Sequence, residues 1–328
     1  MGLKEYVTRR MFHLVITYWA FITTLFVLFR LLPGDPTSLY LQSGMTPEER
    51  QRTLERLGLD EPLHQQYLDY VTNLLVGDLG WSFRHKTAVF DVLATKFWNT
   101  IFLMGAALIL AYLIGVLLGA LLGWWRGRKR EKLGLVGVLI SRSSPEFWTG
   151  IVLLMVFVFW LDWFPSGRMR SIGVIVDGFW DKYLAWDFVH HMVLPLATAT
   201  LYYMTMPVLV MRSGMVNVLT SDFIEIKKAE GLPELTILYK HAARNSILPV
   251  VTIAAVTSGV AIGGSLVIET VFNWPGMGRE MVEAVSFNDY PMAMGAFFLM
   301  GSFVILMNFV ADLLYVYLDP RVTYEGEA

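Results

Sequence analysis

Long apolar runs, each bounded by polar or charged residues, dominate the pattern of this sequence. A helix rises about 1.5 Å per residue, so about 20 apolar residues cross the hydrocarbon core of a membrane. Six segments reach this length and predict an all-α polytopic membrane protein with six transmembrane helices. The predicted spans are residues 10–32, 98–125, 134–160, 191–213, 246–272 and 291–317.

The third predicted span is the least uniform, because Arg142, Pro145 and Glu146 interrupt it. Such a segment is either kinked or lines a polar path through the protein. Charged side chains inside a span usually face an interior or a water-filled path, so Arg142 and Glu146 are candidates for a translocation path. The alternative is that they form a structural ion pair. Met204 and Met206 near the fourth span are further path candidates, although methionine more often fills gaps in packing.

Lysine and arginine residues in the short connections indicate the orientation of the spans. They precede the first span, fill the connection Arg126–Lys132 between the second and third spans, and recur between the fourth and fifth. With six spans, all these residues fall on one side, which is then the cytoplasm, and both termini are cytoplasmic. We expect one transmembrane domain over residues 1–328, in which residues 33–97 form a long helical loop on the outer side.

The long outer loop carries local signals for a helix and a turn. Thr46 is a predicted N-cap, Pro47 suits the first helical position, and Gly58 suits the end of that helix. Asp35, within "LPGDP", is predicted to cap a turn before Pro36.

Two further candidates lie at the outer end of the fifth predicted span. Trp274 lies in the turn "NWPGMG", and Glu269 lies just before it. They are candidates for an outer gate or for contact with a partner on that side. For Glu269, a structural hydrogen bond to the turn is the alternative.

A charged stretch separates the fourth and fifth predicted spans, and we expect it to form two short amphipathic helices. Phe223, Ile226 and Ala229 recur at helical spacing, and Gly231 ends the first helix because glycine tolerates a left-handed backbone. Pro233 suits the first turn of a second helix. In that helix Leu235, Leu238 and Ala242 are expected to share one face. The stretch is either a basic surface helix lying on anionic lipid or a docking element for a soluble partner.

Composition removes several classes of function. The chain is 55% hydrophobic and only 16% charged, where soluble domains carry nearer a quarter, and its net charge of −2 gives no reason to expect nucleic acid. It has no cysteine, which excludes disulfides, thiolate catalysis and Cys-ligated metal sites. A Gly-x-x-x-x-Gly-Lys-Ser/Thr phosphate loop is absent, as is a His-Glu-x-x-His metal motif. The chain is therefore not itself an ATPase of that common type.

Several motifs together resemble one family. "DFIEIKKAEGL" followed by "KHAARNSILPV" resembles the cytoplasmic coupling loop of ATP-binding-cassette importer permeases of the dipeptide/oligopeptide/nickel branch. "RLLPGDP", "SPEFWTGIVLLMVF", "VIETVFNWPGMGREMVEAVSFNDYP" and "NFVADLLYVYLDPRV" resemble other segments of these permeases in the same order, over nearly the whole chain. Lys227, Glu230 and Pro233 depart from the usual pattern. The matching loop positions are Asp222, Phe223, Ala229, Gly231, Leu232, His241, Ala242, Arg244, Asn245, Leu248 and Pro249.

The resemblance implies a type I importer permease, of the first kind of the two permeases that pair in these systems. Its expected partners are a second homologous permease, two ATPase subunits that use ATP and Mg, an extracytoplasmic substrate-binding protein and membrane lipid. This chain would bind no cofactor and no metal. Residues 214–245 would form the cytoplasmic coupling loop, and Glu269, Trp274 and Asp35 would be candidates for the outer gate or for binding-protein contact. The expected ATPase-coupling residues are Phe223, Ile226, Ala229, Glu230, Gly231 and Leu232.

The substrate and one rival mechanism stay open at this point. Peptides are the expected substrate, while oligosaccharides and nickel complexes are imported by related machinery. An ion-coupled secondary transporter would need acidic groups near the middle of broken helices, and Glu146 in the third span is the obvious residue of this kind. An intramembrane enzyme would need a nucleophile with a base or a metal set, and neither is evident in the sequence.

Overall fold

The computed structural model describes residues 3–31, 46, 48, 51, 60–174, 176, 178–263 and 266–318. Asp35, Pro47 and Gly58 lie outside these residues. The described chain is almost entirely helical, as expected. Its helices are α1 (Leu3–Leu31), α3 (Leu63–Leu75), α4 (Val89–Trp124), α5 (Lys129–Ser143), α6 (Glu146–Leu154), η1 (Met155–Trp160), α7 (Phe179–Leu184), α8 (Trp186–Tyr203), α9 (Thr205–Leu219), α10 (Asp222–Ala229), η2 (Thr236–Ala243), α11 (Arg244–Ser246), α12 (Leu248–Gly263), α13 (Leu266–Val271), α14 (Met277–Ser286) and α15 (Tyr290–Leu318).

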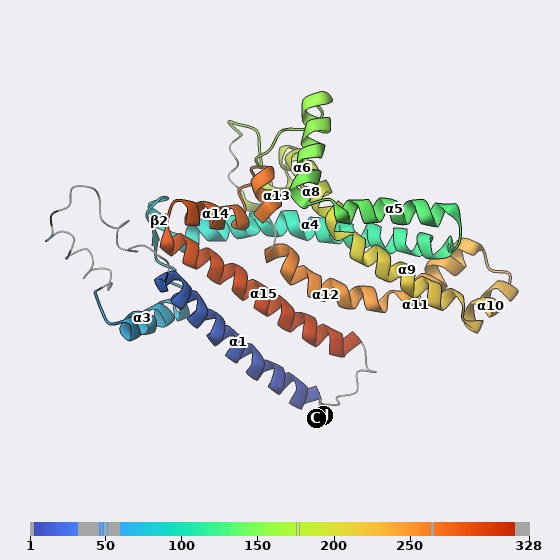
Figure 1. The fold of residues 1–328 in the computed structure, drawn as a ribbon, viewed down its shortest axis with the longest axis horizontal. Coiled ribbons are helices and arrows are strands. Elements are labelled where there is room, and N and C mark those ends of the chain that lie inside the picture. The colour runs from blue at the N-terminus through green and yellow to red at the C-terminus, as the bar shows by residue number, and fades with distance from the viewer. Residues whose placement is uncertain are drawn as a thin grey trace.

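Three helices, α1, α4 and α15, are each long and apolar enough to cross a membrane. Figure 1 shows α1 and α15 side by side and running in opposite directions. Large apolar side chains on α1, such as Phe12 and Trp19, are exposed. In a membrane-spanning helix such residues face lipid or another protein rather than water.

The third and fourth predicted spans are each two helices with a bend between them. The bend between the α5 segment and the α6–η1 segment is 101°, so the third predicted span is kinked, which is one of the two alternatives that the sequence offered. Pro145 is the reason, because proline drives the preceding residue out of the helical conformation and Ser144 is extended. The bend between α8 and α9 at Met204 is 41°. Counting each bent pair as one span gives up to five candidate spans among the described residues.

Helix α4 is the central helix, and small residues let α9 approach it closely. A Cβ atom added at Gly119 would lie 2.6 Å from the carbonyl oxygen of Val208, and one at Gly123 would lie 2.4 Å from Cβ of Met215. Glycines also let α12 approach α15 closely. Gly259 lies against Met307, and Gly263 lies against Val304. Small residues at these positions therefore allow close contact between the helices.

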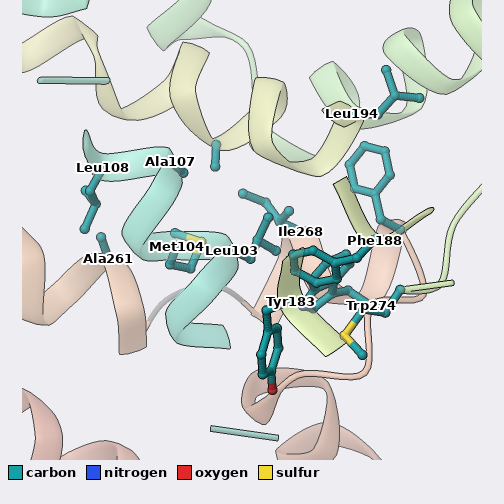
Figure 2. Close-up of a cluster of buried hydrophobic side chains, with 13 residues drawn as sticks. Leu103, Met104, Ala107, Leu108, Tyr183, Phe188, Leu194, Ala261, Ile268 and Trp274 are labelled. Carbon is teal, nitrogen blue, oxygen red and sulfur yellow. The ribbon is translucent and has the colours of Figure 1, made fainter. Parts of the chain in front are cut away.

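A buried apolar cluster fills the space between the first half of α4 and helices α7, α8 and α13 (Figure 2). Its buried aromatic members are Tyr183, Phe188, Phe272 and Trp274, and the ring of Phe102 stacks on that of Tyr183 with 3.9 Å between centroids. The polar atoms of the rings are satisfied: Tyr183 donates to Oδ1 of Asn99 and the indole of Trp274 donates to its carbonyl. This cluster fixes the short loop helices against α4.

The two regions with candidate functional residues lie at opposite ends of α4 (Figure 1). Helix α14 and a two-stranded antiparallel hairpin, β1 (Trp81–Ser82) and β2 (Thr87–Ala88), lie near its beginning. Helix α10 lies beyond its other end, next to α9 and α11.

Candidate functional site

The segment between α9 and α12 forms the two short helices that the sequence predicts. Helix α10 follows α9 after a turn at Thr220 and Ser221, and η2 begins soon after Pro233. The carbonyl of Pro233 accepts hydrogen bonds from the backbone N–H groups of Thr236 and Ile237, at 2.9 and 3.1 Å. The two ends of the segment meet where Gly214 of α9 lies against Ser246, which would be 3.1 Å from an added Cβ.

Gly231 ends α10 in the left-handed conformation, with φ of +72°. Its N–H donates to the carbonyl of Lys228, and the N–H of Glu230 donates to that of Ile226. An added Cβ would meet no atom within 4 Å, so the backbone conformation and not lack of space requires glycine here. The predicted role of Gly231 as a helix terminator is confirmed.

Ile224 attaches α10 to the rest of the protein. Its side chain is fully buried in a cluster that includes Met211 and Met215 of α9 and Ile237 and Leu238 of η2. Leu232 packs against the same cluster. Burying an isoleucine side chain contributes roughly 1.5–3 kcal/mol, which is enough to hold a helix of only eight residues in place. Sequence analysis missed Ile224 because "DFIEIKKA" offers apolar residues on more than one side of the helix.

The apolar side chains on the other side of α10 are exposed. Phe223 is 40% and Ile226 57% exposed, and Ala229 and Glu230 are also exposed. Thus α10 is anchored by one apolar residue and presents two others away from the protein. Asp222 and Glu225 in the first turn and Lys227 and Lys228 in the last turn complement the helix dipole.

The second short helix, η2, buries a different set of residues from the one that the sequence predicts. It is π-helical over Thr236–Ala243, and its buried residues are Ile237, Leu238, Ala242 and Ala243, whereas Leu235 is 69% exposed. The prediction that Leu235 shares a face with Leu238 and Ala242 is wrong. A π-helix closes its hydrogen bonds one residue later than an α-helix, which changes the side chains that share a face.

A ring contact joins the two short helices. The ring of Phe223 meets that of His241 edge-on, with 6.1 Å between centroids. Lys227 forms an ion pair with Glu230 at 2.8 Å on the surface of α10. An exposed pair of this kind contributes little stability, but it keeps both charges beside the exposed apolar residues.

The path candidates Arg142 and Glu146 do not lie on one helix. Arg142 is in the last turn of α5 and Glu146 is the first residue of α6, beyond the break at Pro145. The guanidinium of Arg142 lies 4.0 Å from the centroid of the Tyr202 ring. Across the residues that the structure describes, no ion pair within 4 Å joins the two charges.

The methionine candidates lie at the bend between α8 and α9. Met204 is the residue at the bend and is half-buried, whereas Met206 is 46% exposed. Their role in a translocation path stays a prediction.

Glu269 and Trp274 are fully buried. The hydroxyl of Thr100 donates to Glu269 at 2.5 Å, and the backbone N–H of Arg279 donates to it at 2.9 Å. Glu269 thus makes structural hydrogen bonds to α4 and to the residue that directly follows the turn. Glu269 and Trp274 are both buried in this conformation, and their role in an outer gate or in binding-protein contact stays a prediction.

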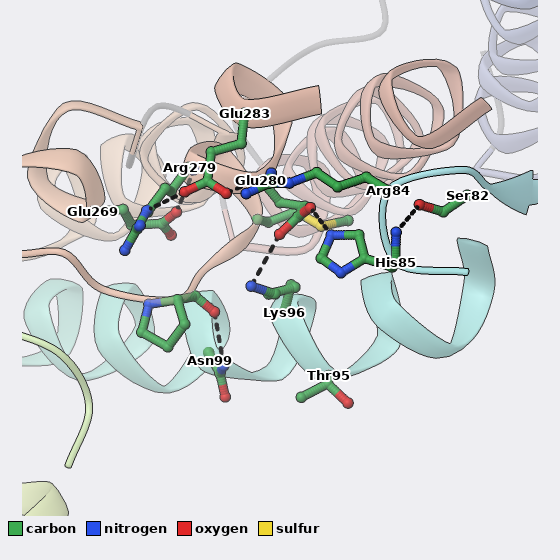
Figure 3. Close-up of polar contacts among 12 residues, drawn as sticks. Ser82, Arg84, His85, Thr95, Lys96, Asn99, Glu269, Arg279, Glu280 and Glu283 are labelled. Carbon is green, nitrogen blue, oxygen red and sulfur yellow. Dashed lines mark hydrogen bonds and ion pairs between the residues drawn. The ribbon is translucent and has the colours of Figure 1, made fainter. Parts of the chain in front are cut away.

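A network of charges clasps the hairpin to α14 (Figure 3). The buried carboxylate of Glu280 pairs with Nε2 of His85 at 2.7 Å and with Nζ of Lys96 at 2.9 Å. Beside it, Glu283 pairs with Arg84 and with Arg279, each at 2.7 Å. We call these residues the clasp. No local pattern in the sequence indicated it, because the hairpin and α14 are 195 residues apart at His85 and Glu280.

Two family models match the chain. One, described as "Binding-protein-dependent transport system inner membrane component", matches residues 115–324. The other, which describes the N-terminal part of such a membrane component, matches residues 3–104.

Characterised relatives match along nearly the whole chain. A di/tripeptide transport system permease protein of Pseudomonas aeruginosa is 34% identical, over 98% of this chain and 99% of the relative. An oligopeptide transport system permease protein of Bacillus subtilis is 34% identical, over 91% and 93% respectively. A glutathione transport system permease protein of Salmonella typhimurium is 32% identical, over 98% and 99%.

The fold also matches a solved structure. A chain of the MetNI methionine ABC transporter, in an inward-facing conformation, aligns with a TM-score of 0.54 and 17% identity, covering 70% of this chain and 97% of that chain. At this identity the likeness concerns the fold alone. The chain therefore belongs to the family of binding-protein-dependent transport system inner membrane components, as a membrane permease with the type I ABC importer fold and a transport component rather than an enzyme.

Proposed function

We propose that this chain forms one half of the pore of a di/oligopeptide importer and couples to its ATPase subunits through α10. The observation that carries this proposal is the pair of exposed apolar side chains, Phe223 and Ile226, on a short helix that buried Ile224 anchors. A helix that inserts into a groove of a partner presents apolar residues in this way. The relatives are transport system permeases for di/tripeptides, oligopeptides and glutathione, which favours peptides as the substrate.

The proposed topology has six spans with both termini in the cytoplasm. The first, second and sixth spans are α1, α4 and α15, the third and fourth are the two bent pairs, and the fifth comprises α12 and α13. The basic connection Arg126–Lys132 lies at the same end of α4 as α10 (Figure 1), which favours the cytoplasm for that end. The clasp and residues 33–97 would then be on the outer side.

The route for coupling runs through contacts of named residues. A movement of α10 reaches Ile224 first, and Ile224 lies in one buried cluster with Met215 of α9. Met215 in turn packs directly on Gly123 of α4. ATP can drive such a movement only if it binds one conformation of the complex more tightly than the other. The nucleotide and its Mg would be bound by the ATPase subunits and not by this chain.

The proposed complex contains a second homologous permease, two ATPase subunits and a substrate-binding protein. The same machinery importing oligosaccharides or nickel complexes is the second candidate. An ion-coupled secondary transporter would work without ATPase subunits, and the exposed apolar side of α10 would then have no partner.

The test uses the absence of cysteine from the chain. Ile226→Cys in the assembled importer should cross-link to an ATPase subunit. Lys228→Cys, exposed on the same helix but about 200° away around its axis, should react far less. Uptake of labelled dipeptide, lactose-type oligosaccharide and nickel chelate in proteoliposomes with the binding protein then identifies the substrate. Equal reaction of the two cysteines would contradict docking through α10, and uptake confined to the sugar or the chelate would contradict peptide import.

A further inference from the structure

Glu131 is a buried acid within the most basic stretch of the chain. It is only 5% exposed, whereas Arg126, Arg128, Lys129 and Lys132 around it are exposed. Acidic residues are rarely buried unless they are paired, so this side chain has a specific interaction to make.

The carboxylate of Glu131 joins two parts of the protein. One oxygen accepts hydrogen bonds from Nε of Arg212 in α9, at 2.8 Å, and from its Nη2. The other oxygen accepts from the backbone N–H of Gly127 at 2.6 Å, in the turn between α4 and α5. Gly127 has φ of +80°, which makes this tight turn possible. One carboxylate thus fixes both the shape of the turn and the position of α9 beside it.

Helices α4 and α9 also approach each other closely at this place. A Cβ atom added at Gly123, four residues before Gly127, would lie 3.3 Å from the carbonyl oxygen of Arg212 itself. Helix α9 continues only to Leu219 and is followed by α10 after two residues. The Glu131–Arg212 pair therefore lies between the docking helix of the proposed function and the long central helix.

We propose that Glu131 is a positioning residue for energy coupling. Together with Arg212 it holds α9 to the α4–α5 turn, so that a displacement received at α10 moves α4, α5 and α9 as one body. This inference rests on the proposed function and adds the residue that keeps the transmission stiff. Without the pair, α9 would slide along α4 and the displacement would be lost before it reached the pore.

A carboxylate buried in an ion pair is a costly way to obtain stability alone, because removing its charge from water offsets much of the attraction to Arg212. Apolar residues already join α4 to α9 through Met211 and Met215. The pair also fixes the position of α9 along the axis of α4, because hydrogen bonds between a guanidinium and a carboxylate require a specific geometry. This favours a role in transmission over one in simple packing.

The test compares Glu131→Gln with Lys129→Gln, which also changes one charge in the first turn of α5 but alters an exposed side chain. The readout is substrate molecules taken up per ATP hydrolysed by the complete importer in proteoliposomes. We expect Glu131→Gln to lower this ratio by about ten-fold, within the ~5–150-fold range typical of coupling between sites, and the concentration of loaded binding protein at half-maximal ATPase activity to stay unchanged. Exchange of the two charges, Glu131→Arg with Arg212→Glu, should raise the ratio above that of either single variant.

A second measurement needs no variant of the pair and so does not depend on the folding of Glu131→Gln. Spin labels at Lys132→Cys and Asn217→Cys, both exposed, report the separation of α5 and α9. We expect one distance that is the same without nucleotide and with ATP bound. A distance that changes with ATP, or a normal uptake ratio in Glu131→Gln, would overturn the inference. Either result can occur while Ile226→Cys still cross-links to the ATPase. Failure of the inference about Glu131 is therefore distinguishable from failure of the proposed function.

Discussion

The hydroxyl of Ser82 donates a 2.5 Å hydrogen bond to the carboxylate of Asp289, and both side chains are buried. The same oxygen of Asp289 accepts from the backbone N–H of Arg84 at 3.2 Å, and its other oxygen accepts from that of Met292. Asp289 therefore connects the β1–β2 hairpin to the start of α15, beside the clasp. Buried polar groups left without a partner cost about 1–3 kcal/mol each, so this carboxylate is worth testing first.

Replacing Asp289 by Ala should lower the stability of the permease by about 2–4 kcal/mol, because it removes the acceptor of the Ser82 hydroxyl and of the backbone N–H groups of Arg84 and Met292. Thermal unfolding of the purified importer in mild detergent measures the effect. Asp69→Asn, at an exposed position of α3, is the control and should be neutral. Equal melting temperatures for the two variants would show that the hairpin is held by other contacts.

The clasp should make stability depend on pH through Glu283. Burial raises the pKa of its carboxyl, but hydrogen bonds and charges from Arg84 and Arg279 outweigh this and hold the pKa below its usual range. Since the pKa is lower in the folded state, the ion pairs stabilise the fold at neutral pH, and this contribution is lost as pH falls below about 4.3 and through the folded-state pKa.

Melting curves between about pH 6 and pH 3 check this expectation. The wild-type protein should lose stability more steeply than Glu283→Gln, whose side chain does not titrate in this range. Glu61→Gln, exposed before α3, should follow the wild-type curve. Parallel curves for wild type and Glu283→Gln would contradict the role of this carboxylate.

Substitution of Gly231 should leave the protein folded but impair the coupling of ATP hydrolysis to uptake. Gly231→Val strains a left-handed backbone by roughly 1–2 kcal/mol without a steric clash, so the protein should still assemble while α10 changes its orientation. We expect ATP hydrolysis to continue and peptide uptake to fall. Gly231→Asn is the matched control, because asparagine tolerates this conformation. Normal uptake with Gly231→Val would remove the hinge from the coupling route.

The approach of α9 to α4 should be sensitive to a single methyl group. Gly119→Ala would place a carbon 2.6 Å from the carbonyl of Val208 and 2.7 Å from Met211, whereas Gly105→Ala on the same helix meets nothing within 4 Å. Overpacking of this kind costs about 1–3 kcal/mol. Thermal unfolding should therefore show a loss for Gly119→Ala and none for Gly105→Ala, and equal values would mean that the helices separate freely.

Local chemistry made much of the architecture predictable. Apolar length located α1, α4 and α15, and the preference of glycine for positive φ located the end of α10 at Gly231. Pro145 indicated an interruption in the third span. Its size, a bend of 101°, depends on packing that the sequence pattern does not contain.

Other features depend on contacts between distant residues. Whether α10 buries Phe223 or Ile224 is decided by Met211 and Met215 of another helix, so periodicity within eight residues could not select the anchor. The clasp could not be predicted for the same reason. Leu235 was assigned to the wrong face because the sequence pattern gave no sign that this helix is a π-helix.

The clasp also sets an order of events during synthesis. His85 and Glu280 are 195 residues apart, and at about 5–20 residues per second the ribosome needs roughly 10–40 s between them. Throughout that time the hairpin has no α14 to bind, and His85 and Lys96 have no Glu280. The hairpin must therefore remain without these ion pairs until α14 has been synthesised.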